Sequence, residues 1–176
     1  MNFFLTCVIG VNGHLVSNYI SSNFATYFQH FLDEEKCSGS DALFSTYRQL
    51  FSDLVDGPID ITFSGTTAVS CFINKNLILT ANAGDSRAIV GTKLTETTWV
   101  ARQLSVDHKP SLEKEAIRIL SNGGRIEPYI LEDGELCGPE RVWLQDEDIP
   151  GLAMSRSIGD LVAVSVGVTW EPGKLK

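Results

Sequence analysis

The order in which helical and strand-like patterns follow one another constrains the fold of this chain most. Apolar residues recur at three-and-four spacing from Val16 to Leu32 and again from Leu43 to Val55, which predicts two helices that each bury one face. From Thr66 onward the pattern changes to short β-rich runs separated by turn residues. Because the helices are grouped rather than alternating with strands, the sequence favours an α+β layered fold over a doubly wound parallel sheet.

The element boundaries follow from turn and cap residues. The first helix is expected over 15–32, and Ser40 is expected to cap a second helix that ends before Gly57. A buried strand is expected at 1–11, followed later by an antiparallel meander of strands at 66–73, 77–83, 86–90 and 99–104. A third helix begins near Pro110, strands follow at 125–131 and 136–144, and residues 161–170 have β-rich composition. The spacing predicts a core that includes Phe24, Phe28, Leu50, Leu54, Val69, Ile78, Ile89 and Ile117.

Composition narrows the class of protein and its partners. The 176 residues, 43% of them hydrophobic, suit one domain, and no apolar run reaches the ~20 residues of a membrane-spanning helix. With 14 basic and 22 acidic residues the net charge is −8, which argues against nucleic acid and anionic membranes as partners. The four cysteines lie 30, 34 and 66 positions apart, a spacing that excludes zinc and redox motifs. They are expected to be buried free thiols in a cytoplasmic or nuclear protein.

The first candidate site is a turn at 11–14, where a strand ends and a helix starts. Asn12 offers a side-chain oxygen, Gly13 a backbone carbonyl and His14 an imidazole within a short stretch, as the beginning of a hydrated metal site would. The alternative is an ordinary Asn-Gly turn with a helix cap and a surface histidine.

The second candidate is the tight turn at 82–87. It would point the carboxylate of Asp85 into solvent or a cleft, where Arg87 could hold it by a charge-assisted hydrogen bond. Turn chemistry alone is the alternative. His108 precedes the third helix and has no recognisable nucleophile nearby in the sequence. A structural role at the start of that helix is therefore favoured over a role as catalytic base.

Six segments, taken together and in order, are more informative than any one turn. The segments are Phe-Ser-Gly-Thr-Thr-Ala at 63–68, Thr-Ala-Asn-Ala-Gly-Asp-Ser-Arg-Ala at 80–88, Leu-Ser-Val-Asp-His-Lys-Pro at 104–110, Asn-Gly-Gly-Arg-Ile at 122–126, Arg-Val-Trp-Leu at 141–144, and Pro-Gly-Leu-Ala-Met-Ser-Arg-Ser-Ile-Gly-Asp at 150–160. They closely resemble the type 2C metal-dependent protein serine/threonine phosphatases, most strongly over residues 63–172 and moderately over the opening strand and first helix.

The resemblance implies a four-layer α/β/β/α sandwich of two antiparallel sheets flanked by helices. It also implies hydrolysis of phosphoserine and phosphothreonine by a water that two Mg²⁺ or Mn²⁺ ions activate. Gly13 would give its carbonyl to one metal, and His14 would lie beside the leaving oxygen. Asn12 stands where the family has the aspartate that bridges both metals, and Asp85 matches an acid that helps bind a third, weaker metal in several members.

Departures from the family pattern leave alternatives open for residues 1–176, expected to be a single partial catalytic domain truncated at both ends. A phosphate-binding arginine and an acidic ligand are expected before the 11–14 turn, and Asp-Gly and Asp-Asn motifs beyond 160. The chain shows neither, and Asn12 is a neutral amide. Three interpretations therefore stay open. The chain is part of an active enzyme, or it is a catalytically incomplete module that binds a kinase or phosphoprotein, or it is a non-functional fragment. Substrate, pathway and oligomeric state stay open.

Overall fold

The computed structural model describes residues 2–175 of the chain, with the side chains of 4–173. Its elements follow the order β1 (Asn2–Ile9), α1 (Gly13–Asp33), α2 (Gly39–Asp56), β2 (Gly65–Asn74), β3 (Leu77–Ala83), β4 (Ile89–Lys93), β5 (Trp99–Gln103), α3 (Glu113–Ser121), β6 (Gly124–Ile130), β7 (Leu136–Leu144), β8 (Pro150–Leu152), β9 (Ile158–Gly159), α4 (Leu161–Val164) and β10 (Gly173–Leu175).

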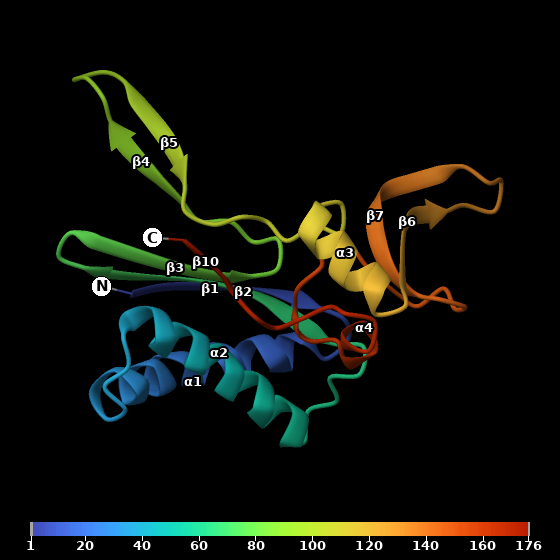
Figure 1. The fold of residues 1–176 in the computed structure, drawn as a ribbon, viewed down its shortest axis with the longest axis horizontal. Helices are drawn as coiled ribbons and strands as arrows, with labels where there is room; N and C mark the ends of the chain where they lie inside the picture. The colour runs from blue at the N-terminus through green and yellow to red at the C-terminus, as the bar shows by residue number, and fades with distance from the viewer. Residues whose placement is uncertain (1, 176) are drawn as a thin grey trace.

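A five-stranded sheet forms the centre of the molecule. Its order is β1-β2-β3-β10, and β9 also pairs with the start of β2, every pairing being antiparallel. The two long helices α1 and α2 cover one face of this sheet (Figure 1). The expected α+β class, with antiparallel sheets and grouped helices, is confirmed.

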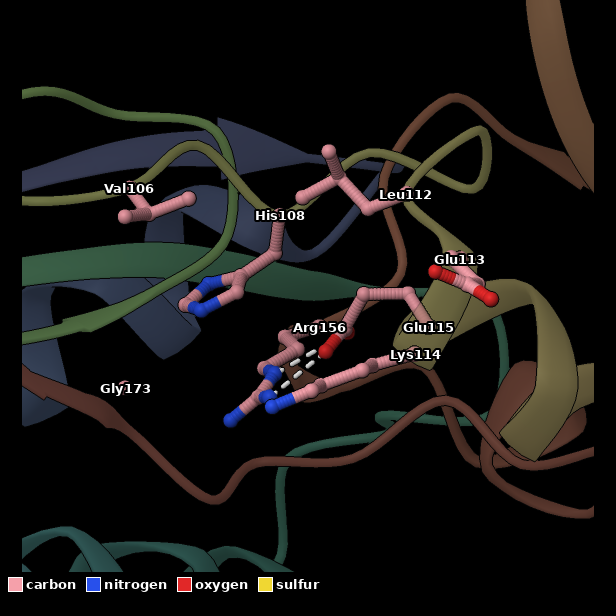
Figure 2. Close-up of a pocket in the computed structure, with 8 residues that line it drawn as sticks. All are labelled: Val106, His108, Leu112, Glu113, Lys114, Glu115, Arg156 and Gly173. Atoms are coloured by element: carbon pink, nitrogen blue, oxygen red, sulfur yellow. Dashed lines mark hydrogen bonds and ion pairs between the residues drawn. The ribbon is translucent and has the colours of Figure 1, made fainter.

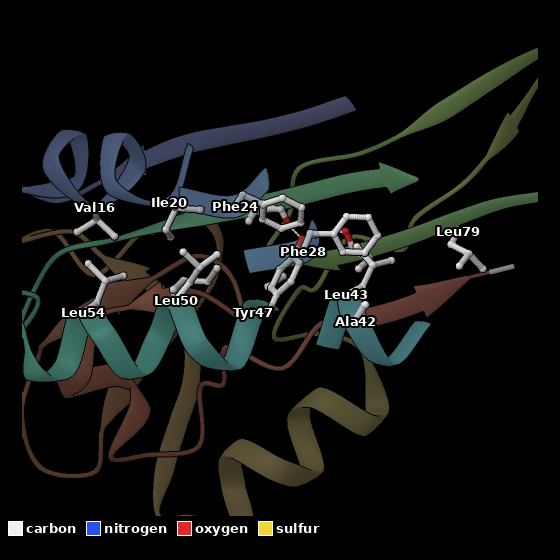
Figure 3. Packing of buried hydrophobic residues seen from close by; sticks show 14 of the residues in the cluster. Val16, Ile20, Phe24, Phe28, Ala42, Leu43, Tyr47, Leu50, Leu54 and Leu79 are labelled. Carbon is white, nitrogen blue, oxygen red and sulfur yellow. Dashed lines mark hydrogen bonds between the residues drawn. The ribbon is translucent and has the colours of Figure 1, made fainter. Parts of the chain in front are cut away.

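The main core lies between these two helices and the sheet. The helical stripes meet there (Figure 3), and four of the predicted core residues, Phe24, Phe28, Leu50 and Leu54, are buried as expected. At the centre of α2 the hydroxyl group of Tyr47 lies within hydrogen-bond distance of two carbonyl oxygens of the sheet, 3.1 Å from that of Ala68 in β2 and 3.0 Å from that of Ala81 in β3. This contact fixes the position of α2 on the sheet.

The remaining strands form two smaller sheets, β4-β5 and β6-β7-β8. The expected meander is therefore wrong at one point, because β3 pairs with β2 and β10 rather than with β4. The β4-β5 hairpin extends away from the main sheet (Figure 1). A second core joins α3, α4 and the β6-β7-β8 sheet through Ile119, Val142, Leu152, Ala163, Val166 and Val168.

Two predicted core residues are exposed. Ile89 is 62% exposed because it lies on the two-stranded β4-β5 hairpin, and Ile117 is 58% exposed because α3 turns Ile119 inward instead. Val69 is buried as predicted, and Ile78 is half-buried.

Local details also differ from expectation. Ser38 rather than Ser40 caps α2, because the Ser38 hydroxyl accepts a hydrogen bond from the backbone of Asp41 at 3.3 Å. Residues 161–164 form a helical turn where an extended run was expected.

The opening strand is less buried than expected. β1 pairs only with β2 in the described part of the chain, and as an edge strand it leaves Leu5 56% and Val8 51% exposed. Met1, which the prediction included, lies outside the described residues. The four cysteines are free, but Cys7 and Cys137 are exposed rather than buried. Among the described residues no helix is both long and apolar enough to span a membrane.

Candidate functional site

The turn before α1 is anchored to the segment that leads into β2. The backbone N–H of Asn12 donates to the hydroxyl of Ser64 at 3.0 Å, and its side-chain Nδ2 donates to the carbonyl of Asp60 at 3.2 Å. Gly13 is buried so closely against Gly65 that an added Cβ would lie 2.9 Å from the Gly65 carbonyl oxygen. Only glycine fits there without a shift of the backbone. His14 is exposed in the first turn of α1.

A buried acid lies against Gly65, where the space for a Cβ is taken by the Asp160 carboxylate. Asp160 is 3% exposed, and its carboxylate accepts a hydrogen bond from the hydroxyl of Ser157 at 2.5 Å. Burial raises the pKa of Asp160 to about 6, although the Ser157 hydrogen bond opposes that rise. Sequence analysis assigned this acid no role of its own, and its one signal was its place in the Ser-Arg-Ser-Ile-Gly-Asp segment.

The turn at 82–87 contacts β2 at Thr67, two residues after Gly65. Gly84, at φ +108°, packs on Thr67, and the hydroxyls of Ser86 and Thr67 lie 2.6 Å apart. The expected pairing of Arg87 with Asp85 is wrong. Arg87 instead makes a two-pronged ion pair with Asp107, at 2.9 and 2.7 Å.

The carboxylate of Asp85 pairs with the ammonium of Lys109. The Arg87–Asp85 pairing was wrong because the loop that carries residues 107–109 folds back beside residues 84–87 and supplies both partners. The His108 backbone N–H donates to the Gly84 carbonyl at 3.0 Å in this loop contact.

The structure thus brings both predicted turns to the beginning of β2. Gly13 lies beside Gly65, and the turn that carries Asp85 lies beside Thr67. A shared metal-binding role for Asn12, Gly13 and Asp85 stays a prediction, as does a catalytic role for His14.

A buried ion network supports the segment that follows. Glu115 of α3 is 4% exposed and accepts hydrogen bonds from Arg156 at 3.0 and 2.6 Å, from Arg118 at 2.7 Å and from the Ser155 hydroxyl at 2.7 Å. Burial alone would raise the pKa of Glu115, but these donors outweigh it and hold the pKa well below its usual range. This network was not predicted from the sequence, because Ser155 and Arg156 lie 40 and 41 positions from Glu115 and only Arg118 is a near neighbour in the helix.

The metal-ligating groups that the structure describes do not by themselves make a two-metal site. Mg²⁺ and Mn²⁺ prefer anionic oxygen ligands. Within residues 2–175 no three histidine, cysteine, aspartate or glutamate side chains gather as a metal cluster. Asn12 is neutral, and Asp85 is already paired with Lys109.

Several solved structures share this arrangement of helices and sheets. A serine-threonine phosphatase 2C from Toxoplasma gondii matches with a TM-score of 0.72 at 22% identity, over 99% of this chain and 61% of that one. A Caenorhabditis elegans sex determining protein matches with a TM-score of 0.71 at 24% identity, over 99% of this chain and 39% of that one. At these identities the likeness establishes the fold.

Sequence comparisons define the family. The model of the protein phosphatase 2C family matches residues 2–173. A relative from Arabidopsis thaliana named "Probable protein phosphatase 2C 65" is 34% identical over 93% of this chain and 47% of its own length. The rice protein "Probable protein phosphatase 2C 12" is 46% identical over 65% of this chain and 28% of its own length. The chain belongs to the protein phosphatase 2C family of serine/threonine phosphatases, and it spans less than half the length of these relatives.

Proposed function

We propose that the protein to which this chain belongs hydrolyses phosphoserine and phosphothreonine in other proteins, with Mg²⁺ or Mn²⁺ as cofactor. The family match over residues 2–173 carries this proposal. Phosphoproteins are then its substrates, a kinase is a further candidate partner, and the cytoplasm or nucleus is the proposed location because the described cysteines are free thiols. Residues 1–176 would form a single partial catalytic domain.

The N-terminal end of α1 is the part of this chain that suits a phosphoryl group. The first turn of α1 contains no acidic residue, so the positive end of the helix dipole is not offset by a neighbouring carboxylate. His14 is exposed in that turn and would donate a proton to the departing serine or threonine oxygen. Any metal ligands would have to include carboxylates that the described residues do not gather.

A second candidate function is binding of a phosphoprotein or a kinase without hydrolysis. One observation favours it. Asn12 occupies the position that the resemblance assigns to a bridging aspartate, and its amide is engaged with the Asp60 carbonyl. Loss of a carboxylate weakens a hard-cation site.

One assay separates the two functions. Purified chain is incubated with a phosphothreonine peptide and excess Mn²⁺, and released phosphate and retained peptide are both measured. Release that a chelator abolishes, and that His14→Ala reduces while His30→Ala does not, supports hydrolysis. Saturable peptide binding without release supports the binding module. If the chain neither releases phosphate nor binds the peptide, both functions are contradicted.

A further inference from the structure

A cavity of about 380 Å³ lies beside the start of α3, apart from the 11–14 turn. Three parts of the chain enclose it: the loop that carries Val106 and His108, the beginning of α3, and the segment that carries Arg156 and Gly173 (Figure 2). The volume is in the range of small-molecule sites.

His108 contributes a ring nitrogen, Nε2, to the donors and acceptors available near this cavity. The residue is 4% exposed, and its Nδ1 lies 3.3 Å from the Gly84 nitrogen and 3.2 Å from the Gly84 carbonyl oxygen. Nε2 has no hydrogen-bond partner among the side chains and backbone that the structure describes. Burial, with a smaller contribution from the charge of Arg156, lowers the pKa of His108 to about 4, so the ring is neutral at pH 7.

Two cations supply further donors. Arg156 uses one N–H on each of its three nitrogens, two towards Glu115 and one towards the Glu171 carbonyl, which leaves two of the five guanidinium N–H groups without a partner within the described part of the chain. The Lys114 ammonium likewise has no ion pair with a described residue. Figure 2 shows the Lys114 and Arg156 side chains extending toward the same side of the cavity, with the Glu113 carboxylate turned away from them.

The beginning of α3 adds an electrostatic and an apolar contribution. Leu112 occupies the N-cap position and makes no side-chain cap, so the first backbone N–H groups of α3 are uncapped, and the Glu113 and Glu115 carboxylates in the first turn offset part of their positive charge. The side chains of Leu112 and Val106 are 39% and 47% exposed and give the cavity an apolar wall. The cavity therefore combines hydrogen-bond donors with an apolar surface.

We propose that this cavity binds a small organic monocarboxylate, whose carboxylate meets Lys114, Arg156 and Nε2 of His108 while its apolar body lies against Leu112 and Val106. A carboxylate accepts hydrogen bonds, so its binding favours the His108 tautomer with the proton on Nε2. In this tautomer Nδ1 is free to accept the hydrogen bond from the Gly84 N–H.

A monoanion suits the site better than a phosphate dianion. Glu113 and Glu115 also line the cavity, so its two cations are balanced by two acids. A second negative charge on the ligand would be repelled without a further cation to offset it. The proposal does not rest on the proposed phosphatase function, because binding is measured without turnover.

The test uses the full chain labelled with ¹⁵N in its histidines and benzoate as the probe. We expect the Nε2 resonance of His108 to move saturably at pH 7, with a dissociation constant on the order of 1 mM for so small a ligand. Benzyl alcohol, which has the same ring and no charge, is expected to bind at least about tenfold more weakly.

Lys114→Met keeps the aliphatic stem of an exposed side chain and removes its charge, so the fold is retained. It is expected to weaken benzoate binding about fivefold, whereas Lys93→Met, on the distant β4 strand, leaves it unchanged. Equal affinity for benzoate and benzyl alcohol, equal effects of the two lysine variants, or an unmoved His108 signal would each overturn the proposal.

Discussion

Replacing Glu115 by glutamine should destabilise the fold strongly. The substitution keeps the size of the side chain but leaves Arg118 and Arg156 without the carboxylate that both contact at 2.7 Å or less. Removal of one partner from a buried ion pair costs about 3–5 kcal/mol. The side chains of Arg118 and Arg156 remain 27% and 18% exposed and gain some hydration, so we expect a loss of about 3 kcal/mol, the lower end of that range.

Urea unfolding at pH 7, followed by tryptophan fluorescence, measures this loss. With a slope of about 2 kcal/mol per molar urea, the midpoint should fall by about 1.5 M while the slope stays constant. Glu113→Gln is the matched control, because Glu113 lies in the same helical turn, is exposed and belongs to no described ion pair. A loss below about 1 kcal/mol for Glu115→Gln, or equal losses for both variants, would refute the reasoning.

The same group predicts a pH dependence. The folded pKa of Glu115 is depressed below the ordinary value of 4.5, so the unfolded chain takes up a proton first as the pH falls. The contribution of Glu115 to stability is fully present above pH 4.5 and declines as the pH falls below it. The difference in unfolding free energy between the natural chain and Glu115→Gln should therefore narrow in acid. A constant difference from pH 7 to pH 3 would contradict this.

The remaining predictions concern the turn, the buried histidine and the main core. Asn12→Asp should tighten Mn²⁺ binding about tenfold by calorimetry without raising phosphate release, and Asn76→Asp should change neither; faster phosphate release by Asn12→Asp than by the natural chain would contradict this. The His108 imidazole should stay neutral in NMR titrations down to about pH 4, and stability should fall as the pH drops below 6.5, because the unfolded chain binds the proton first; titration near 6.5 would show that the ring is not buried. Tyr47→Phe removes the buried hydroxyl near two sheet carbonyls and should cost about 1 kcal/mol in denaturant unfolding, and an unchanged midpoint would contradict that value.

The two long helices could be predicted because their information is local. Side chains three and four positions apart share a helix face, so the apolar stripe that includes Phe24 and Phe28 already specifies which face is buried. The family motifs were also legible as short ordered segments, and the match over 2–173 confirms them. The candidate residues Asn12 and Gly13 came from the 11–14 turn, and Asp85 came from the 82–87 turn within the second of those motifs.

Partner choice between distant segments could not be predicted. Asp85 is the acid nearest to Arg87 in the sequence, but the folded loop places Asp107 against Arg87 and pairs Asp85 with Lys109. Strand pairing shows the same limit, since the composition of residues 86–90 predicts a strand that the structure places at Ile89–Lys93, but does not show that this strand pairs with β5 and not with β3.

The sequence by itself determined the class of fold, the family and the residue types at each turn, because these depend on local periodicity and on short motifs. Tertiary structure alone decided that Arg156 and Ser155 enclose the Glu115 carboxylate, and that His108 is buried beside Gly84. Burial and charge pairing depend on which surfaces meet after the chain has folded. The spacing of residues along the chain carries no such information when the partners lie 24 to 41 positions apart.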